Sequence, residues 1–225
     1  MTSQGYEGTD RRPLASRQTR WARDAASWLS RRGIRPNAIS LFGMAVGCAG
    51  GALLTLTGRV APVPRRIDWL AAAVMIQLRL ICNLLDGMVA VATGRASRTG
   101  ELYNEIPDRV SDPVTLIGAG YALGGLPVLG YLAACLELLT AYVRVMGKAA
   151  GAKQEFCGPM AKQQRMFVLT LIAIYCGLAP SSWQPLARSG AGIMAAALGL
   201  IIVGSGVTVI RRLKRIARQL EQPRE

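Results

Sequence analysis

Six long apolar runs dominate this sequence, and each is about as long as a helix that crosses a lipid bilayer. Such a helix needs about 20 mostly apolar residues. The runs lie at residues 37–57, 67–92, 101–125, 126–147, 165–180 and 189–210. Charged residues make up only 18% of the 225 residues, against about 25% in soluble domains. The sequence therefore predicts an all-α polytopic membrane protein with six transmembrane helices.

The second and third runs differ from the others because they carry charged and amide side chains. A charge at the centre of a membrane helix costs about 2.5–3.5 kcal/mol on insertion scales. The polar residues are Arg79, Asn83, Asp86, Asn104, Glu105, Asp108, Arg109 and Asp112. The sequence around them is too apolar for a soluble domain. We therefore interpret them as the lining of a cavity inside the membrane.

Lysine and arginine are distributed unevenly between the two sides of the membrane. With six spans both termini lie on one side, which carries 20 of the 27 Lys and Arg residues, whereas the other side carries 4. The positive-inside rule makes the first side cytoplasmic. The net charge of +14 thus follows membrane topology, and we expect no nucleic-acid partner. The expected location is the cell or inner membrane, with both termini and the polar cavity facing the cytoplasm.

The chain divides into four expected segments. These are a disordered cytoplasmic tail (1–16), an amphipathic juxtamembrane helix (17–34), a six-helix membrane domain (35–212) and a basic cytoplasmic tail (213–225). The second segment places apolar residues at helical spacing between arginines, namely Trp21, Ala25, Trp28 and Leu29. This pattern suits a helix that lies on an anionic membrane surface and binds membrane lipids. A simple positively charged anchor is an equal alternative.

Histidine is absent, and this restricts the possible chemistry. Metal ligation by histidine, Ser-His and Cys-His nucleophile pairs and a histidine general base are all excluded. The five cysteines stand alone and form no CxxC pair, so a zinc ribbon or a thioredoxin motif is unsupported. Acid–base chemistry is left to carboxylates, lysines, tyrosines and cysteines.

Carboxylates and amides form two stripes at helical spacing. In the second run Asn83 and Asp86 share one face, and in the third run the face holds Asn104, Asp108 and Asp112, with Glu105 adjacent. The short connection 93–99 predicts that the two helices are antiparallel neighbours. The stripes then meet in one pocket that is open to the cytosol, because Asn83 lies roughly 15 Å from the turn at about 1.5 Å per residue.

The pocket has the composition of a site for a hard cation. Oxygen ligands without histidine or cysteine favour Mg²⁺ or Mn²⁺. The small residues Gly87, Ala90 and Gly100 leave room for a phosphate or diphosphate beside the ion. Two other interpretations of the cluster remain open. One is a set of ion pairs that locks the two helices, with Arg79 and Arg109 against the aspartates. The other is a proton or cation relay of a transporter.

The two stripes resemble the signature motif of the CDP-alcohol phosphotransferases. The family pattern is D-x2-D-G-x2-A-R-x8-G-x3-D-x3-D, and this chain keeps its spacing at every position from Asn83 to Asp108. Three identities differ: Asn83 and Asn104 replace aspartates, and Val91 replaces the arginine. The similarity extends over about residues 20–210 and includes the segments Pro36–Ser40, Tyr142–Arg144 and Gly158–Arg165. The chain resembles a divergent branch that carries asparagine at both positions.

The resemblance implies a reaction and a set of roles. Members of the family transfer a phosphatidyl group, usually from CDP-diacylglycerol, to an alcohol and release CMP. By this resemblance two divalent ions bind Asn83, Asp86, Asn104 and Asp108, with Glu105 and Asp112 as further candidate ligands. Asp108 is also the candidate general base. Candidate substrate-binding residues are Asn37, Ser40, Gly87, Ala90, Gly100, Arg144 and Lys162. The resemblance also implies a homodimer.

The two asparagines keep other functions open, because they remove two negative charges from the ligand set. Glu105 or Asp112 would restore part of that charge. One alternative is a membrane protein that binds a CDP-lipid or a metal without catalysis. The other is a hydrolase that acts on CDP-diacylglycerol with water as acceptor. The sequence leaves the alcohol acceptor open, since a phosphorylated polyol, a free polyol, serine and a second lipid all suit the motif.

Overall fold

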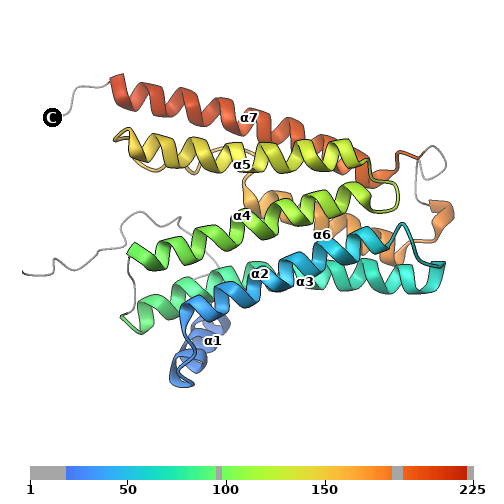
Figure 1. Cartoon of the computed structure of the whole chain (residues 1–225), viewed down its shortest axis with the longest axis horizontal. Helices are drawn as coiled ribbons and strands as arrows, with labels where there is room; N and C mark the ends of the chain where they lie inside the picture. The colour runs from blue at the N-terminus through green and yellow to red at the C-terminus, as the bar shows by residue number, and fades with distance from the viewer. Residues whose placement is uncertain (1–18, 95–97, 184–189, 222–225) are drawn as a thin grey trace, which may run out of the picture.

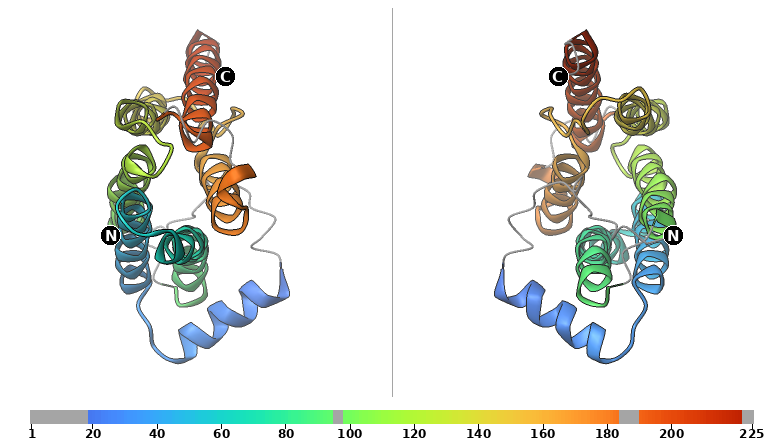
Figure 2. Two further views of the ribbon diagram at one scale, coloured as in Figure 1. Left: turned by 90° about the vertical axis from the view of Figure 1, so that its right-hand side faces the viewer. Right: turned by 90° about the vertical axis from the view of Figure 1, so that its left-hand side faces the viewer.

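The structure is a computed structural model that describes residues 19–94, 98–183 and 190–221. Helices account for nearly all of these residues: α1 (Arg20–Arg31), α2 (Pro36–Leu56), α3 (Pro62–Ala92), α4 (Arg98–Tyr121), α5 (Pro127–Ala149), α6 (Lys162–Leu178), the short 3₁₀ helix η2 (Ser181–Trp183) and α7 (Ile193–Glu221). Helices α2 to α7 run roughly along the long axis of the molecule, and α1 lies across them (Figures 1 and 2). The tail expected at 1–16 lies outside the described residues.

The ends of the helices follow from local sequence. Proline stands in the first turn of α2, α3 and α5, where its missing N–H leaves no hydrogen bond unmade. Gly94 follows α3 with a φ of 63°, a left-handed conformation that suits glycine at the end of a helix. Each predicted run contains one helix, although α3 begins five residues earlier than expected. Helix α7 continues into the expected basic tail and ends at Glu221.

Four helices are long and apolar enough to cross a membrane: α2, α3, α5 and α7. Helix α6 has only 17 residues, and α4 carries four charged side chains close together near its middle. The expectation of a helical protein with membrane spans is therefore confirmed for the described residues, with four spans supported by length and composition.

Helix α2 is the common support of α3 and α4. It packs along both of them, whereas α3 and α4 touch each other at few points. The prediction that α3 and α4 pack directly as neighbours is therefore corrected: mainly side chains of their polar stripes join them. Glycines allow the close approach of α2 to α4. A Cβ atom on Gly118 would lie 2.2 Å from the carbonyl oxygen of Gly51, and one on Gly51 would lie 2.6 Å from that of Val114.

Helix α1 packs against α3 at one end of the bundle (Figure 2). Ala22 and Ala26 are its buried residues, and Ala26 belongs to a small apolar cluster that includes Cys82 of α3. The side chains of Trp21 and Trp28 are about half exposed, at 49% and 50%. The helix therefore docks through its small residues and leaves both tryptophans on the outside.

Candidate active site

The polar stripes of α3 and α4 meet at Asn83. Its side-chain nitrogen donates hydrogen bonds to Asn104 Oδ1 and to Asp108 Oδ1, both at 3.2 Å. One turn earlier on α3, the buried guanidinium of Arg79 forms an ion pair with Asp108 and donates a hydrogen bond to Ser111 Oγ at 3.0 Å. The motif spacing thus brings together amide and carboxylate groups from two helices that otherwise make little contact.

Asp86 lies one turn beyond Asn83 and is buried. Ser40 of α2 donates a hydrogen bond of 2.6 Å to its Oδ2. The other oxygen, Oδ1, is buried and accepts no hydrogen bond from the described residues. Asp86 interacts electrostatically with both Asp108 and Arg79, so the three groups belong to one charged cluster. Ser40, a predicted substrate-binding residue, is placed to orient this carboxylate.

Asp108 receives most of its contacts on one oxygen. Its Oδ1 accepts hydrogen bonds from Arg79, from Asn83 and from Lys162 Nζ at 2.5 Å. Its Oδ2 accepts only the long contact of 3.4 Å from Asn83 among the residues that the structure describes. Lys162 also approaches Asp112 Oδ2 at 3.3 Å. The first residue of α6 therefore bridges two acidic residues one turn apart on α4.

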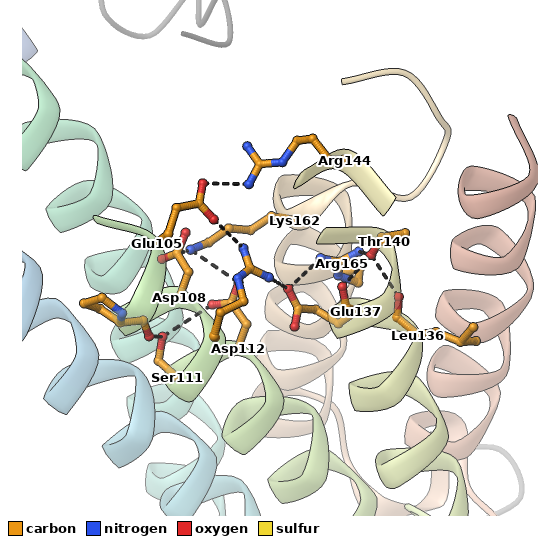
Figure 3. A network of polar contacts seen from close by, with 12 residues as sticks. Glu105, Asp108, Ser111, Asp112, Leu136, Glu137, Thr140, Arg144, Lys162 and Arg165 are labelled. Atoms are coloured by element: carbon orange, nitrogen blue, oxygen red, sulfur yellow. Dashed lines mark hydrogen bonds and ion pairs between the residues drawn. The ribbon is translucent and has the colours of Figure 1, made fainter. Parts of the chain in front are cut away.

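A second group of ion pairs continues the cluster toward α5 and α6 (Figure 3). Glu105 accepts from Arg144 at 2.6 Å and from Arg109 at 3.3 Å. Arg109 also pairs with Glu137 of α5, which Arg165 of α6 approaches at 3.5 Å. Arg144 and Lys162, which are predicted to bind substrate, both contact acidic residues of α4.

Glu137 is the member of this network that the sequence analysis missed. Only 1% of its side chain is exposed. Thr140, one turn further along α5, donates to the carbonyl oxygen of Glu137 and lies 3.4 Å from an Arg165 nitrogen. A signal was available, since an ionisable residue inside an apolar run usually has a partner or a function. Its partners lie 28 residues away in the sequence, and spacing alone cannot identify them.

The remaining predicted residues lie around the cluster. Gly87 and Ala90 are half-buried on α3, and Gly100 is half-buried in the first turn of α4. Asn37 lies one turn before Ser40 on α2 and is also half-buried. Part of the expected turn at 93–99 lies outside the described residues.

The four motif positions offer two carboxylates and two amides, and this oxygen-rich set fits a hard cation. Among the described residues, no group of three acidic or cysteine side chains is arranged to hold a metal ion. The candidate ligand oxygens belong instead to both carboxylate and amide side chains. The buried Asp86 Oδ1, which lacks a hydrogen-bond donor, is an oxygen that a cation would satisfy. Oxygen-only ligands of this kind suit Mg²⁺ or Mn²⁺.

Comparison with known families identifies the family of this chain. The family model of the CDP-alcohol phosphatidyltransferases matches residues 34–208. This range includes α2 to α6, most of α7 and every residue of the cluster. The chain therefore belongs to the CDP-alcohol phosphatidyltransferase family, a family of membrane enzymes.

Several relatives have names that describe lipid synthesis. The chain is 27% identical over 200 residues to a phosphatidylinositol phosphate synthase of Streptomyces avermitilis, covering 86% of this chain and 77% of the relative. It is 29% identical over 206 residues to an archaetidylinositol phosphate synthase of Aeropyrum pernix, covering 91% and 94%.

Solved structures share the fold. The phosphatidylinositol phosphate synthase of Mycobacterium tuberculosis with CDP-DAG bound gives a TM-score of 0.70 at 19% identity, covering 92% of this chain and all of that one. The same enzyme with manganese and citrate gives a TM-score of 0.72, also at 19% identity, covering 91% and 93%.

Proposed function

We propose that this protein transfers the phosphatidyl group of CDP-diacylglycerol to the hydroxyl group of an alcohol and releases CMP. This activity makes it a transferase of phospholipid biosynthesis. Family membership supports the reaction. The crystal structure of the Mycobacterium tuberculosis enzyme with CDP-DAG bound motivates the choice of donor. The observation that carries the proposal is the junction of the two motif halves, where Asn83 of α3 bonds to Asn104 and Asp108 of α4.

The site is proposed to bind a divalent cation, Mg²⁺ or Mn²⁺, as the relative crystallised with manganese suggests. Its ligands would come from Asn83, Asp86, Asn104 and Asp108, with Glu105 and Asp112 as further candidates. Family resemblance favours two ions. When bound, the metal neutralises the diphosphate and stabilises CMP as the leaving group. Ser40 donates a hydrogen bond to Asp86 Oδ2. This contact fixes the direction in which the other carboxylate oxygen, Oδ1, points.

Asp108 is the proposed general base. The acceptor oxygen attacks the phosphorus of the phosphatidyl group, the bond from that phosphorus to the CMP oxygen breaks, and CMP keeps the bonding electrons. The acceptor proton passes to Asp108. Oδ2 is the oxygen suited to receive it, because Arg79 and Lys162 contact Oδ1. A positioned base of this kind typically contributes about 10²- to 10⁴-fold to the rate.

The remaining site residues are proposed to bind substrate. Gly87, Ala90 and Gly100 would leave space for the cytidine nucleotide, and Asn37 lies close to the same end of α2. Arg144 and Lys162 lie on the side of the cluster formed by α5 and α6, where the acceptor would enter. A diacylglycerol tail would remain in the hydrocarbon between the helices.

The proposed topology has six spans, in which α4 and α6 also cross the membrane. The end of α3, the start of α4 and the ends of α5 and α7 lie toward one end of the bundle (Figure 1). Their basic residues favour the cytoplasm for this end, and thus for both termini and the site. Helix α1 would lie on that membrane surface, with Trp21 and Trp28 exposed toward the lipid. A homodimer is proposed from family resemblance.

Two classes of acceptor are compatible with this reaction. One carries a phosphate group, as the phosphorylated products named for the relatives suggest. The other is an alcohol without phosphate.

The proposed function is tested by measuring CMP release from CDP-diacylglycerol by the purified protein in detergent. The expected result is release that requires Mg²⁺ or Mn²⁺, stops with EDTA and rises when an alcohol is added. Release of CMP and phosphatidate without any alcohol would indicate a hydrolase instead. A metal-dependent rise in melting temperature with the lipid, but no CMP under any condition, would indicate a binding protein.

Replacing Ser40 by alanine is expected to weaken metal binding. The variant removes the hydrogen bond that Ser40 donates to Asp86 Oδ2, and loss of such an outer contact typically lowers metal affinity or activity about 10- to 100-fold. The measurement is the Mn²⁺ concentration that gives half-maximal CMP release, which should rise. Thr55→Ala is the matched control, because Thr55 is also on α2 and donates its hydrogen bond to the carbonyl oxygen of Gly51, away from the site. Equal Mn²⁺ requirements in the two variants would contradict this role.

A further inference from the structure

The basic residues on the acceptor side of the site are already paired with acidic residues of the same chain. Arg144 binds Glu105, Lys162 binds Asp108 and Asp112, and Arg165 approaches Glu137. Figure 3 shows the Arg144, Lys162 and Arg165 side chains directed toward these carboxylates. A phosphate group on the acceptor would have to compete with each of them.

The described charges of the whole cluster balance. Its five acidic members are Asp86, Glu105, Asp108, Asp112 and Glu137, and its five basic members are Arg79, Arg109, Arg144, Lys162 and Arg165. These ten residues therefore supply no surplus positive charge. The divalent cations of the proposed function add charge, and the two ionised phosphates of the donor offset one of these cations. A phosphorylated acceptor would bring a further charge of about −1.5 to −2 at pH 7.

Among the acidic members of the cluster, Glu105 would interact most strongly with such a phosphate. It is the most exposed of the acidic side chains in the described ion pairs, at 41%, and it binds the Arg144 guanidinium, of which 15% is exposed. Arg144 also lies over the ring of Phe156, at 5.5 Å from the centroid, so two contacts fix its position. A phosphate that reached Arg144 would lie beside the Glu105 carboxylate. Like charges placed in contact inside a binding site repel each other and exclude the wrong partner.

We infer that the acceptor is an alcohol that carries no phosphate group, and that Glu105 excludes phosphorylated alcohols. This inference rests on the proposed transfer reaction. It makes Glu105 a residue of substrate specificity, which acts by neutralising Arg144 and by repelling a phosphate.

The first experiment compares matched acceptors in the CMP-release assay with CDP-diacylglycerol and Mn²⁺. The pairs are glycerol with glycerol 3-phosphate and myo-inositol with its 1-phosphate. Release with the free alcohol should exceed release with its phosphate by at least about tenfold, and Glu105→Gln should reduce that ratio by about tenfold. Glu221→Gln is the control, since Glu221 is exposed at the end of α7 and should leave the ratio unchanged. A wild-type preference for either phosphorylated acceptor overturns the inference.

A second experiment needs no turnover and separates the two proposals. Inorganic phosphate is titrated calorimetrically into the Mn²⁺-loaded protein in detergent. No saturable binding is expected for the wild type, and binding is expected to appear in Glu105→Gln and to be lost again in Glu105→Gln with Arg144→Gln. Saturable binding to the wild type that Arg144→Gln abolishes overturns the inference, as does no gain in Glu105→Gln. Absence of CMP with every acceptor counts against the proposed function, while this titration still decides the role of Glu105.

Discussion

Asp108→Asn is expected to lower the rate of CMP release by about 10²- to 10⁴-fold, which is the usual contribution of a positioned general base. Asparagine keeps the shape of the side chain and an oxygen that can accept from Arg79 and Lys162. It cannot take up the acceptor proton, and it is a weaker ligand for a divalent ion. The measurement is the initial rate at saturating donor, acceptor and metal.

The control for this variant is Asp24→Asn, because Asp24 is exposed on α1 and far along the chain from the motif. Thermal unfolding in detergent should show that Asp108→Asn still folds, since the hydrogen-bond acceptors of the site remain. Turnover of Asp108→Asn at the wild-type rate would exclude Asp108 as the base.

Glu137→Ala is expected to destabilise the bundle strongly, by about 3–5 kcal/mol, the usual cost of removing one partner of a buried ion pair. Two guanidinium groups depend on this carboxylate, those of Arg109 on α4 and Arg165 on α6. Its loss removes a counter-charge from both guanidinium groups, which lie between three helices. The measurement is the midpoint of thermal unfolding in detergent.

The matched control is Glu221→Ala, which removes an exposed acidic side chain from α7 and should change the midpoint little. Glu137→Leu combined with Arg165→Met should regain part of the lost stability, because a buried charge is then removed together with its partner. An unchanged midpoint in Glu137→Ala would show that the ion pairs of Glu137 do not hold the bundle together.

The helices and the motif were predictable because their signals are local. Apolar runs of membrane length marked every long helix, and proline at positions 36, 62 and 127 begins three of them. The spacing from Asn83 to Asp108 was enough to predict that the two polar stripes meet, since helical periodicity fixes which residues share a face. The observed hydrogen bonds of Asn83 to α4 agree with that geometry.

The partners of the charged residues were not predictable, because they depend on which helices become neighbours. The sequence did not indicate that α2 would stand behind both α3 and α4, nor that Lys162 at the start of α6 would reach Asp108. Ser40 was predicted to bind substrate, and its contact with Asp86 was not predicted. In each case the sequence identified a polar residue worth attention, and only the packing of the helices decided what it touches.

The glycines of α2 set how far apart the two halves of the motif lie, although they are outside the active site. Helices α3 and α4 carry the two halves of the motif, and both rest on α2, which approaches α4 so closely that Gly51 and Gly118 leave no room for a methyl group. A methyl group added at this contact between α2 and α4 would push the two helices apart. It would move Asp108 away from Asp86 without touching any candidate metal ligand. A misplacement of about 1 Å far from the chemistry can lower a rate about 100-fold. The alignment of the reacting groups is therefore maintained in part by residues that have no side chain.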